Sequence, residues 1–268
     1  MLASSSQILR HSWHNLCPNV KLGLMTNGLR KLDMDTLEKI SWVRVSINAA
    51  DSKSYKKIHG RDKFYDALES ISYYLSSKVE MVNIGFVFTP LIYIDIVKFS
   101  VMFFEFLVRK QIDWKKGLTI QFRPVADASY SRFKLSKEQI HDLDSQLLRV
   151  SENVHQFILT NTNYNEVVKN QCIPLTTQFS RCSFSVLQLN IDAKGDVYPC
   201  PQKAHTYVSK ISNLFDKNFV KELPAKLRDS YELHSISSCP SCCHCSINAA
   251  FERLDLTQNY LDNIGQFF

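Results

Sequence analysis

Between residues 20 and 150 the chain alternates four times between a short strand-like segment and a longer helix-like segment. The strand-like segments show period-2 alternation or a short apolar run, and the helix-like segments place apolar residues three and four apart. The expected strands cover 20–24, 42–47, 79–88 and 118–122, and the expected helices cover 33–40, 62–75, 91–108 and 136–150. Strand–helix alternation predicts an α/β fold with a parallel sheet and right-handed crossovers.

Local signals refine these elements. The near-continuous apolar run of 79–88 predicts a strand that is buried on both faces. Asp33 or Asp35 suits the N-terminus of the first helix, and the pair Ser136 and Gln139 has the spacing of a capping box.

The pattern changes after residue 165, so we expect two domains, 1–165 and a smaller one at 166–268. In the second, 185–191 and Val197–Tyr198 predict a β-hairpin, with Gly195 in its turn at positive φ. An amphipathic helix follows over 219–233 and contains Pro224.

Composition excludes several classes of protein. A chain of 268 residues with 12% aromatic residues is not intrinsically disordered, and eight cysteines are too few for a disulfide scaffold of this length. The net charge of +6 comes from scattered basic residues, and no glycine-rich phosphate loop is present, so we expect no nucleic-acid partner. The most apolar stretch, 81–94, is too short to span a bilayer, and no secretory signal is evident. We therefore expect a cytoplasmic, reducing location and no membrane association.

The cysteines suggest a metal centre. A hairpin brings its ends together, so Cys182 and Cys200 could bind one metal with the CxxC pair Cys239 and Cys242. Four thiolates suit tetrahedral zinc or a [4Fe–4S] cluster, and the wide separation of the first pair favours the cluster moderately. Cys243 and Cys245 are possible alternative ligands, and a set of thiols without metal stays open. Cys17 and Cys172 are interpreted as ordinary buried thiols.

The cysteine spacing also carries a family resemblance. The pattern Cys182-x12-Gly195-x4-Cys200 followed by Cys239-x2-Cys242 resembles the auxiliary-cluster motif of radical S-adenosylmethionine enzymes with twitch or SPASM carboxy-terminal domains. The segments that carry the resemblance are 192–201 and 211–214 around the cysteines, and 24–28, 42–48 and 55–61 upstream, which resemble barrel strands and their loops.

The resemblance implies a fold and a chemistry. The fold would be a partial parallel (β/α) radical-SAM barrel plus a small β-hairpin/helix domain that holds a [4Fe–4S] cluster. The activity would be that of an oxidoreductase or modifying enzyme, in which a 5′-deoxyadenosyl radical derived from S-adenosylmethionine attacks a peptide or small-molecule substrate. A reductant such as flavodoxin or ferredoxin would supply electrons.

The resemblance also implies roles for individual residues. Ser46 and Asn48 would face the ribose or aminoacyl part of the cofactor, and Arg61 would bind its carboxylate. Thr26, Asn27 and Gly28 would shape the same rim, and Arg123 would meet the substrate. The simpler alternatives, a strand-end cap for Ser46 and a solvated side chain for Arg61, stay open.

The chain departs from the family in one respect, because the CxxxCxxC motif of the catalytic cluster is absent. We therefore expect domain 1–165 to lack the first two barrel strands and the chain to be inactive alone. The alternatives are a non-catalytic remnant that binds one [4Fe–4S] cluster and a zinc-stabilised interaction domain.

Overall fold

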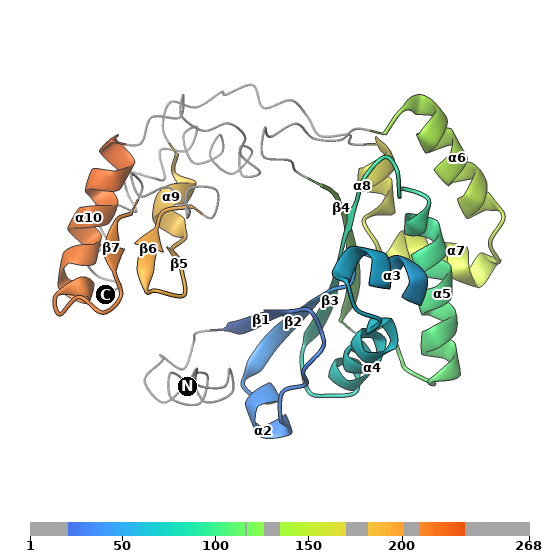
Figure 1. The fold of residues 1–268 in the computed structure, drawn as a ribbon, viewed down its shortest axis with the longest axis horizontal. Helices are drawn as coiled ribbons and strands as arrows, with labels where there is room; N and C mark the ends of the chain where they lie inside the picture. The colour runs from blue at the N-terminus through green and yellow to red at the C-terminus, as the bar shows by residue number, and fades with distance from the viewer. Residues whose placement is uncertain (1–20, 116, 126–134, 170–181, 201–209, 234–268) are drawn as a thin grey trace. The chain divides into compact units, whose positions relative to one another are not determined.

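The computed structural model describes residues 21–115, 117–125, 135–169, 182–200 and 210–233 (Figure 1). The chain divides into two compact units, Met1–Ile173 and Pro174–Phe268. The described part of the first unit contains a four-stranded parallel sheet, and that of the second contains a three-stranded antiparallel sheet. The fold is therefore mixed α/β, as the sequence predicts.

The parallel sheet has the strand order β1-β2-β3-β4, which is also the order along the chain. Its strands are β1 (Leu22–Thr26), β2 (Ile40–Ser46), β3 (Met81–Phe88) and β4 (Leu118–Pro124). Each strand pairs in parallel with the next, so all four carboxyl ends lie at one edge of the sheet. The four predicted strands are confirmed, with shifts of a few residues at their ends.

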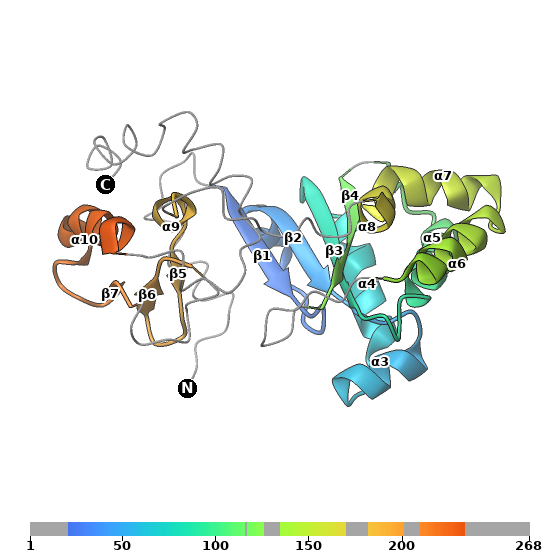
Figure 2. The ribbon, with the colours of Figure 1, turned by 90° about the horizontal axis from the view of Figure 1, so that it is seen from above.

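Seven helices are described in the first unit. They are α2 (Met34–Leu37), α3 (Ser52–His59), α4 (Phe64–Leu75), α5 (Asp95–Arg109), α6 (Lys137–Leu148), α7 (Glu152–Asn161) and α8 (Tyr164–Lys169). Figures 1 and 2 show α4, α5 and α7 along one face of the sheet. The predicted capping residues are confirmed: Asp33 accepts a hydrogen bond from Thr36 N at 3.0 Å, and Ser136 and Gln139 cap each other reciprocally.

The main hydrophobic core lies between this face and the helices. Four of its side chains are no more than 1% exposed: Val45, Ile84, Phe86 and Ile120. The ring of Phe86 packs against that of Phe99 of α5, with 5.2 Å between the ring centroids. Burial of so many aromatic and branched side chains is the principal stabilisation of this unit.

The prediction that β3 is buried on both faces is wrong. Met81 is 44% exposed and Val87 is 37% exposed, because no helix of the described part of the first unit covers that face. Because these two exposed residues are themselves apolar, the sequence of 81–88 looks like a continuous apolar run although its side chains alternate between a buried and an exposed face. The prediction also missed α3, α7 and α8. In α3 only Tyr55 is buried, and few of its residues are apolar.

The predicted boundary after residue 165 falls inside α8. The segment just before α8 is joined to the edge of the parallel sheet by an isolated parallel bridge between Thr162 and Ile120, and the side-chain amide of Asn163 pairs with Phe122 in β4. Its Oδ1 accepts from Phe122 N at 2.7 Å, and its Nδ2 donates to Phe122 O at 2.9 Å. These bonds occupy backbone groups on the outer edge of β4, which would otherwise be exposed at the end of the sheet.

The second unit has the element order α9 (Phe184–Leu187), β5 (Asn190–Ile191), β6 (Asp196–Tyr198), β7 (Ser212–Asn213) and α10 (Phe219–Leu233). The hairpin of β5 and β6 and the helix α10 with Pro224 are confirmed. The expected strand over 185–191 is wrong over most of its length, because 184–187 form a helical turn. This turn places Val186 in a small core with Leu223 and Leu227 of α10.

Candidate functional site

The uncovered face of the parallel sheet, which we call the open face, carries a distinct set of side chains. Strand alternation and register assign twelve positions to it: Gly23, Met25, Trp42, Arg44, Ser46, Met81, Asn83, Gly85, Val87, Thr119, Gln121 and Arg123. This set contains two arginines, four residues with an amide or hydroxyl group (Ser46, Asn83, Thr119 and Gln121), and no carboxylate. On β2, β3 and β4 the opposite positions are mostly apolar and buried.

Two glycines on the open face make room for larger neighbours. A Cβ on Gly23 would lie 1.9 Å from the ring of Trp42, so the indole covers that glycine. A Cβ on Gly85 would lie 2.7 Å from Arg44 Nε and 2.9 Å from Arg44 Nη2, so the guanidinium of Arg44 crosses from β2 over β3. Gly85 is followed across the sheet by Gln121 of β4, its register partner.

Gln121 connects this position to the second arginine. Its Oε1 accepts a hydrogen bond from Arg123 Nη2 at 2.5 Å. Burial lowers the pKa of Arg44, and the positive charge of Arg123 lowers it further. Neither guanidinium forms an ion pair with a carboxylate within the part of the chain that the structure describes.

The loop after β2 forms the carboxyl rim of the open face. Ser46 ends β2 on this face, and Asn48 follows at φ 52°, a left-handed conformation that asparagine tolerates better than most residues. The Oδ1 of Asn48 accepts from Val87 N at 2.8 Å, and His59 Nε2 lies 3.1 Å from Ile47 O. Side chains thus terminate the β2–β3 ladder, so the loop is held from both sides.

The outer side of the same loop is held by charged groups. Lys98 of α5 forms an ion pair with Asp51, the N-cap of α3. The hydrogen bond from Lys98, together with the backbone N–H of Ser54, lowers the pKa of Asp51 to about 2. Burial raises the pKa of the neighbouring Asp95, which accepts a hydrogen bond from the backbone of Ala50.

The turn of Thr26, Asn27 and Gly28 lies at the same edge of the sheet, but its contacts are local. Thr26 Oγ1 accepts from Gly28 N at 3.1 Å, and Asn27 Oδ1 accepts from Leu29 N at 3.2 Å. Thr26 pairs with Val45, so it lies on the helix-covered face, opposite to Ser46. Gly28 has φ 74°, and a Cβ there would lie 2.9 Å from Val45 Cγ1. These contacts indicate a role in building the turn.

Arg61 lies on the exposed connection between α3 and α4. It follows Gly60, which ends α3 in the left-handed conformation at φ 72°. Within the described residues, no hydrogen bond or ion pair links Arg61 to Ser46 or Asn48. The structure therefore brings Ser46, Asn48 and Arg44 to one rim and face, and it gives no contact that joins Arg61 to them.

The second unit contains the first two predicted cluster ligands. Cys182 is half-buried just before α9, and its carbonyl accepts from Ser185 N at 3.1 Å and from Ser185 Oγ at 2.6 Å. Cys200 is half-buried two residues after β6. Because α9 lies between Cys182 and β5, Cys182 is not at the base of a continuous hairpin strand as expected. Thiolates are the ligands that zinc and iron–sulfur centres prefer.

The remaining predicted ligands, Cys239, Cys242, Cys243 and Cys245, lie outside the described residues. Across the ranges that the structure describes, no group of three or more His, Cys, Asp or Glu side chains gathers as a metal site. The described donors therefore amount to half of the expected four-thiolate set.

The hairpin that leads to Cys200 is fixed by two side chains. Asp192 Oδ1 accepts from Lys194 N at 2.8 Å and from Asp196 N at 2.9 Å, which closes the turn. Asp196 Oδ1 then accepts from Asn213 Nδ2 of β7 at 2.7 Å. Hydrogen bonds from Lys210 and Asn213 lower the pKa of Asp196.

The hydrogen bond between Asn213 and Asp196 joins the segments 192–201 and 211–214, on which the resemblance described above was based. Spacing alone did not single out Asp196 and Asn213, because the chain between β6 and β7 has no periodic signal. The sequence-based prediction of site residues also missed Arg44, Asn83 and Gln121, although their alternation with apolar residues along the strands was a usable signal.

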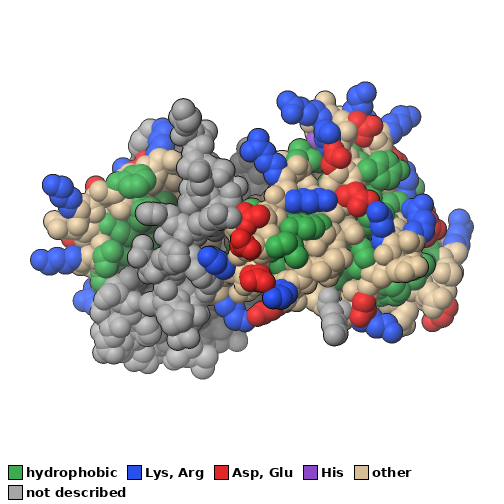
Figure 3. Space-filling view, turned by 90° about the horizontal axis from the view of Figure 1, so that it is seen from below, with side chains coloured by type: hydrophobic (Ala, Val, Ile, Leu, Met, Phe, Trp, Pro, Cys, Tyr) green, Lys and Arg blue, Asp and Glu red, His purple; other side chains and the backbone are tan. Residues whose placement is uncertain are grey.

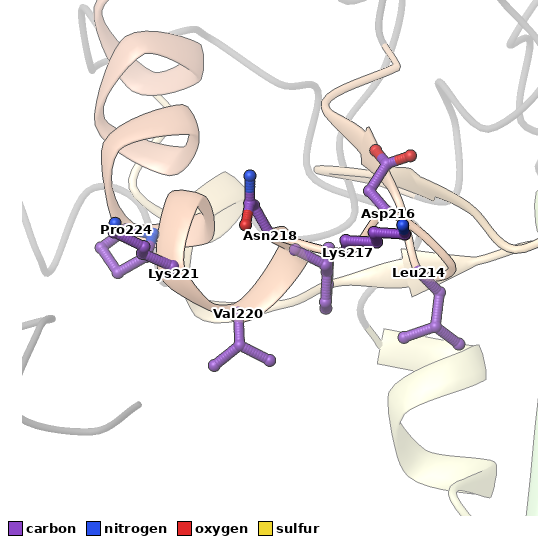
Figure 4. Close-up of a pocket in the computed structure, with 8 residues that line it drawn as sticks. Leu214, Asp216, Lys217, Asn218, Val220, Lys221 and Pro224 are labelled. Atoms are coloured by element: carbon purple, nitrogen blue, oxygen red, sulfur yellow. The ribbon is translucent and has the colours of Figure 1, made fainter.

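The other surface features offer less chemistry. The hollow at the start of α10 is lined by Leu214, Asp216, Lys217, Asn218, Val220, Lys221 and neighbouring side chains, which splay outward in Figure 4. Leu214 and Val220 are 43% and 60% exposed. Basic and acidic side chains are interspersed on the face of the first unit in Figure 3, which shows no extended patch of one sign.

Neither the protein-family models nor the curated proteins that were searched match this chain. Among the helices that the structure describes, none is long and apolar enough to cross a membrane.

Proposed function

We propose that this chain is an iron–sulfur protein of the radical S-adenosylmethionine type whose second unit binds an auxiliary [4Fe–4S] cluster. The observation that supports this most directly is the pair of half-buried thiols that flank the first two strands of the small antiparallel sheet, with Cys182 just before α9 and Cys200 two residues after β6. Half-burial leaves a thiol accessible to a metal while shielding part of it from water.

The cluster would be held by Cys182, Cys200, Cys239 and Cys242, with Cys243 or Cys245 as a possible replacement ligand. It would supply electron transfer during oxidation of a peptide or small-molecule substrate. The chain's own contribution would be positioning: Ser185 fixes the backbone of Cys182, and the bond between Asp196 and Asn213 fixes the strand that leads to Cys200.

S-adenosylmethionine would bind at the carboxyl rim of the parallel sheet. Ser46 and Asn48 would contact its ribose or aminoacyl part, with the turn of 26–28 beside them, and Arg61 would bind its carboxylate. Cleavage of this cofactor needs a catalytic cluster, and its CxxxCxxC motif is not among the 268 residues. We therefore expect the cluster-binding activity, and no turnover, from this chain alone.

Anaerobic reconstitution with ferrous iron and sulfide tests the proposal. We expect about four iron and about four sulfide ions per chain, with the broad visible absorption of a cubane cluster. Cys182→Ser and Cys200→Ser should each lower the bound iron by more than half, and Cys172→Ser is the matched control that should retain it. Zinc bound tightly without sulfide would support the zinc-stabilised domain instead, and equal iron in all variants would contradict the ligand assignment.

A further inference from the structure

Among the residues that the structure describes, neither arginine of the open face has a carboxylate partner that would explain it as part of a structural ion pair. Arg44 is half-buried, and it lies on a strand whose alternate residues form the core. A half-buried guanidinium without a carboxylate loses hydration and gains no ion pair in return. Arg123 is close enough for its charge to act on Arg44, which adds repulsion between like charges.

The geometry directs both side chains to one place. Arg44 extends over Gly85, the register partner of both Ser46 and Gln121. Gln121 in turn holds Arg123 through its Oε1. The Gln121 oxygen thus holds the Arg123 guanidinium next to Gly85, which the Arg44 guanidinium covers. Because an amide is neutral, both positive charges remain.

We propose that Arg44 and Arg123 form an anion-binding site on the open face, which holds a carboxylate of the substrate. Guanidinium groups bind carboxylates through paired, charge-assisted hydrogen bonds. Gly85 keeps the space that Arg44 needs, and Gln121 is a positioning residue for Arg123. The inference rests on the proposed function only in calling the bound carboxylate a substrate, because the site itself needs no cluster.

The surroundings favour a carboxylate over a phosphate. Phosphate sites commonly use backbone N–H groups at a helix N-terminus or a glycine-rich turn. On the open face the backbone amides of β2 and β3 are used in the sheet ladder, so the available donors are side chains. Met25, Met81 and Val87 are 65%, 44% and 37% exposed on the same face, so the ligand is expected to have an apolar part.

Binding of small probes to the full chain tests the site. Glutarate is the small-molecule probe, and a blocked pentapeptide with a central glutamate is the peptide probe. Their neutral controls are glutaramide and the same peptide with glutamine, and inorganic phosphate is the competing anion. We expect calorimetric titration to detect at least one of the two acidic probes, with the neutral partner of that probe binding at least tenfold more weakly.

Three variants separate a built site from general electrostatic attraction. Arg44→Gln should weaken binding about tenfold or more, since hydrogen bonds between charged groups are lost. Arg109→Gln makes the same change in net charge at the exposed end of α5 and should have no more than a twofold effect. Gly85→Ala keeps the charge but displaces the Arg44 side chain, and it should weaken binding at least threefold.

Circular dichroism and thermal unfolding establish that each variant is folded. Equal weakening by Arg44→Gln and Arg109→Gln, equal binding of acidic and neutral probes, or no binding of either acidic probe would overturn the proposal. Tighter binding of phosphate than of both carboxylates would overturn the ligand class. The titration is repeated with a Cys182→Ser/Cys200→Ser variant: retained binding there supports a cluster-independent site, even if the iron–sulfur proposal fails. Loss of binding in this folded variant would contradict that independence.

Discussion

The two faces of the parallel sheet are made by the same strands and yet have opposite chemistry. On β3, Phe86 is fully buried against α5, whereas the next residue, Val87, is 37% exposed on the open face. On β2, Val43 and Val45 are buried on either side of Arg44 in the sequence. Because side chains alternate along a strand, each strand contributes to the core and to a candidate binding surface at once. Stability and ligand chemistry can therefore be varied separately in this unit.

The largest expected difference between the faces is in packing. Phe86→Ala should lower the free energy of unfolding by about 3 to 5 kcal/mol, because it leaves a cavity among Phe99 and Phe122. Val87→Ala should lower it by less than about 1 kcal/mol, since the side chain is already partly hydrated. Urea titration followed by circular dichroism measures both. Similar losses in the two variants would mean that the open face is covered in solution.

A second comparison uses two glycines. Gly117 has φ 68°, and a Cβ there would lie 2.2 Å from Glu80 O, so Gly117→Ala forces the backbone to move. We expect a loss of about 2 kcal/mol or more in the free energy of unfolding. At Gly85 the obstructing atoms belong to the flexible side chain of Arg44, so Gly85→Ala should cost less than about 1 kcal/mol. Thermal unfolding of the pair decides this, and an equal loss would show that Arg44 is rigidly held.

Replacing Arg44 on the open face should, unlike the substitutions above, leave the free energy of unfolding unchanged or raise it. Arg44→Met removes a half-buried charge and its repulsion with Arg123 while retaining a long apolar side chain. We expect the free energy of unfolding to stay equal or to rise by up to about 1 kcal/mol, as is common where binding groups oppose stability. Chemical denaturation at neutral pH measures the change. A loss above about 1.5 kcal/mol would show that Arg44 supports the fold.

The smallest expected effect comes from the ion pair of Asp51 and Lys98 outside the rim. The pKa of Asp51 in the folded state is about 2, below its ordinary value, so its contribution is present above about pH 4 and is lost as the pH falls towards 2. Both side chains are substantially exposed, at 40% and 54%, so the contribution should stay below about 1 kcal/mol.

Asp51→Asn is the matched variant, because asparagine still caps α3 and lacks the charge. The difference in stability between wild type and variant should shrink between pH 5 and pH 2.5. A constant difference over that range would contradict the assigned pKa.

Local signals predicted much of the fold. The four strands, the helices α2, α4, α5 and α6, and α10 follow from periodicity, whereas α7 and α8 were not predicted. The caps at Asp33 and Ser136 follow from short-range hydrogen bonding. The prediction was weaker where a helix buries little, as in α3, and where a short apolar segment suits either strand or helix, as in 184–187.

The candidate site was less accessible to prediction. Cys182 and Cys200 were identified by their spacing, and they stay proposed ligands. Arg44 was overlooked because the residues that surround its side chain are far from it in the sequence. Its neighbours Gly85 and Gln121 are brought to it by strand register, which depends on long-range pairing.

The sequence by itself determined the order of strands and helices, the alternation along each strand, the capped helix starts and the turn at Gly195, because these depend on neighbours a few residues apart. The tertiary structure alone decided that the described helices of the first unit cover only one face, that Arg123 lies near enough to Arg44 to lower its pKa, and that Asp196 bonds to Asn213. Those outcomes depend on which strands pair and in which register. The pairing reflects the burial of the whole apolar face, a property that no single segment contains.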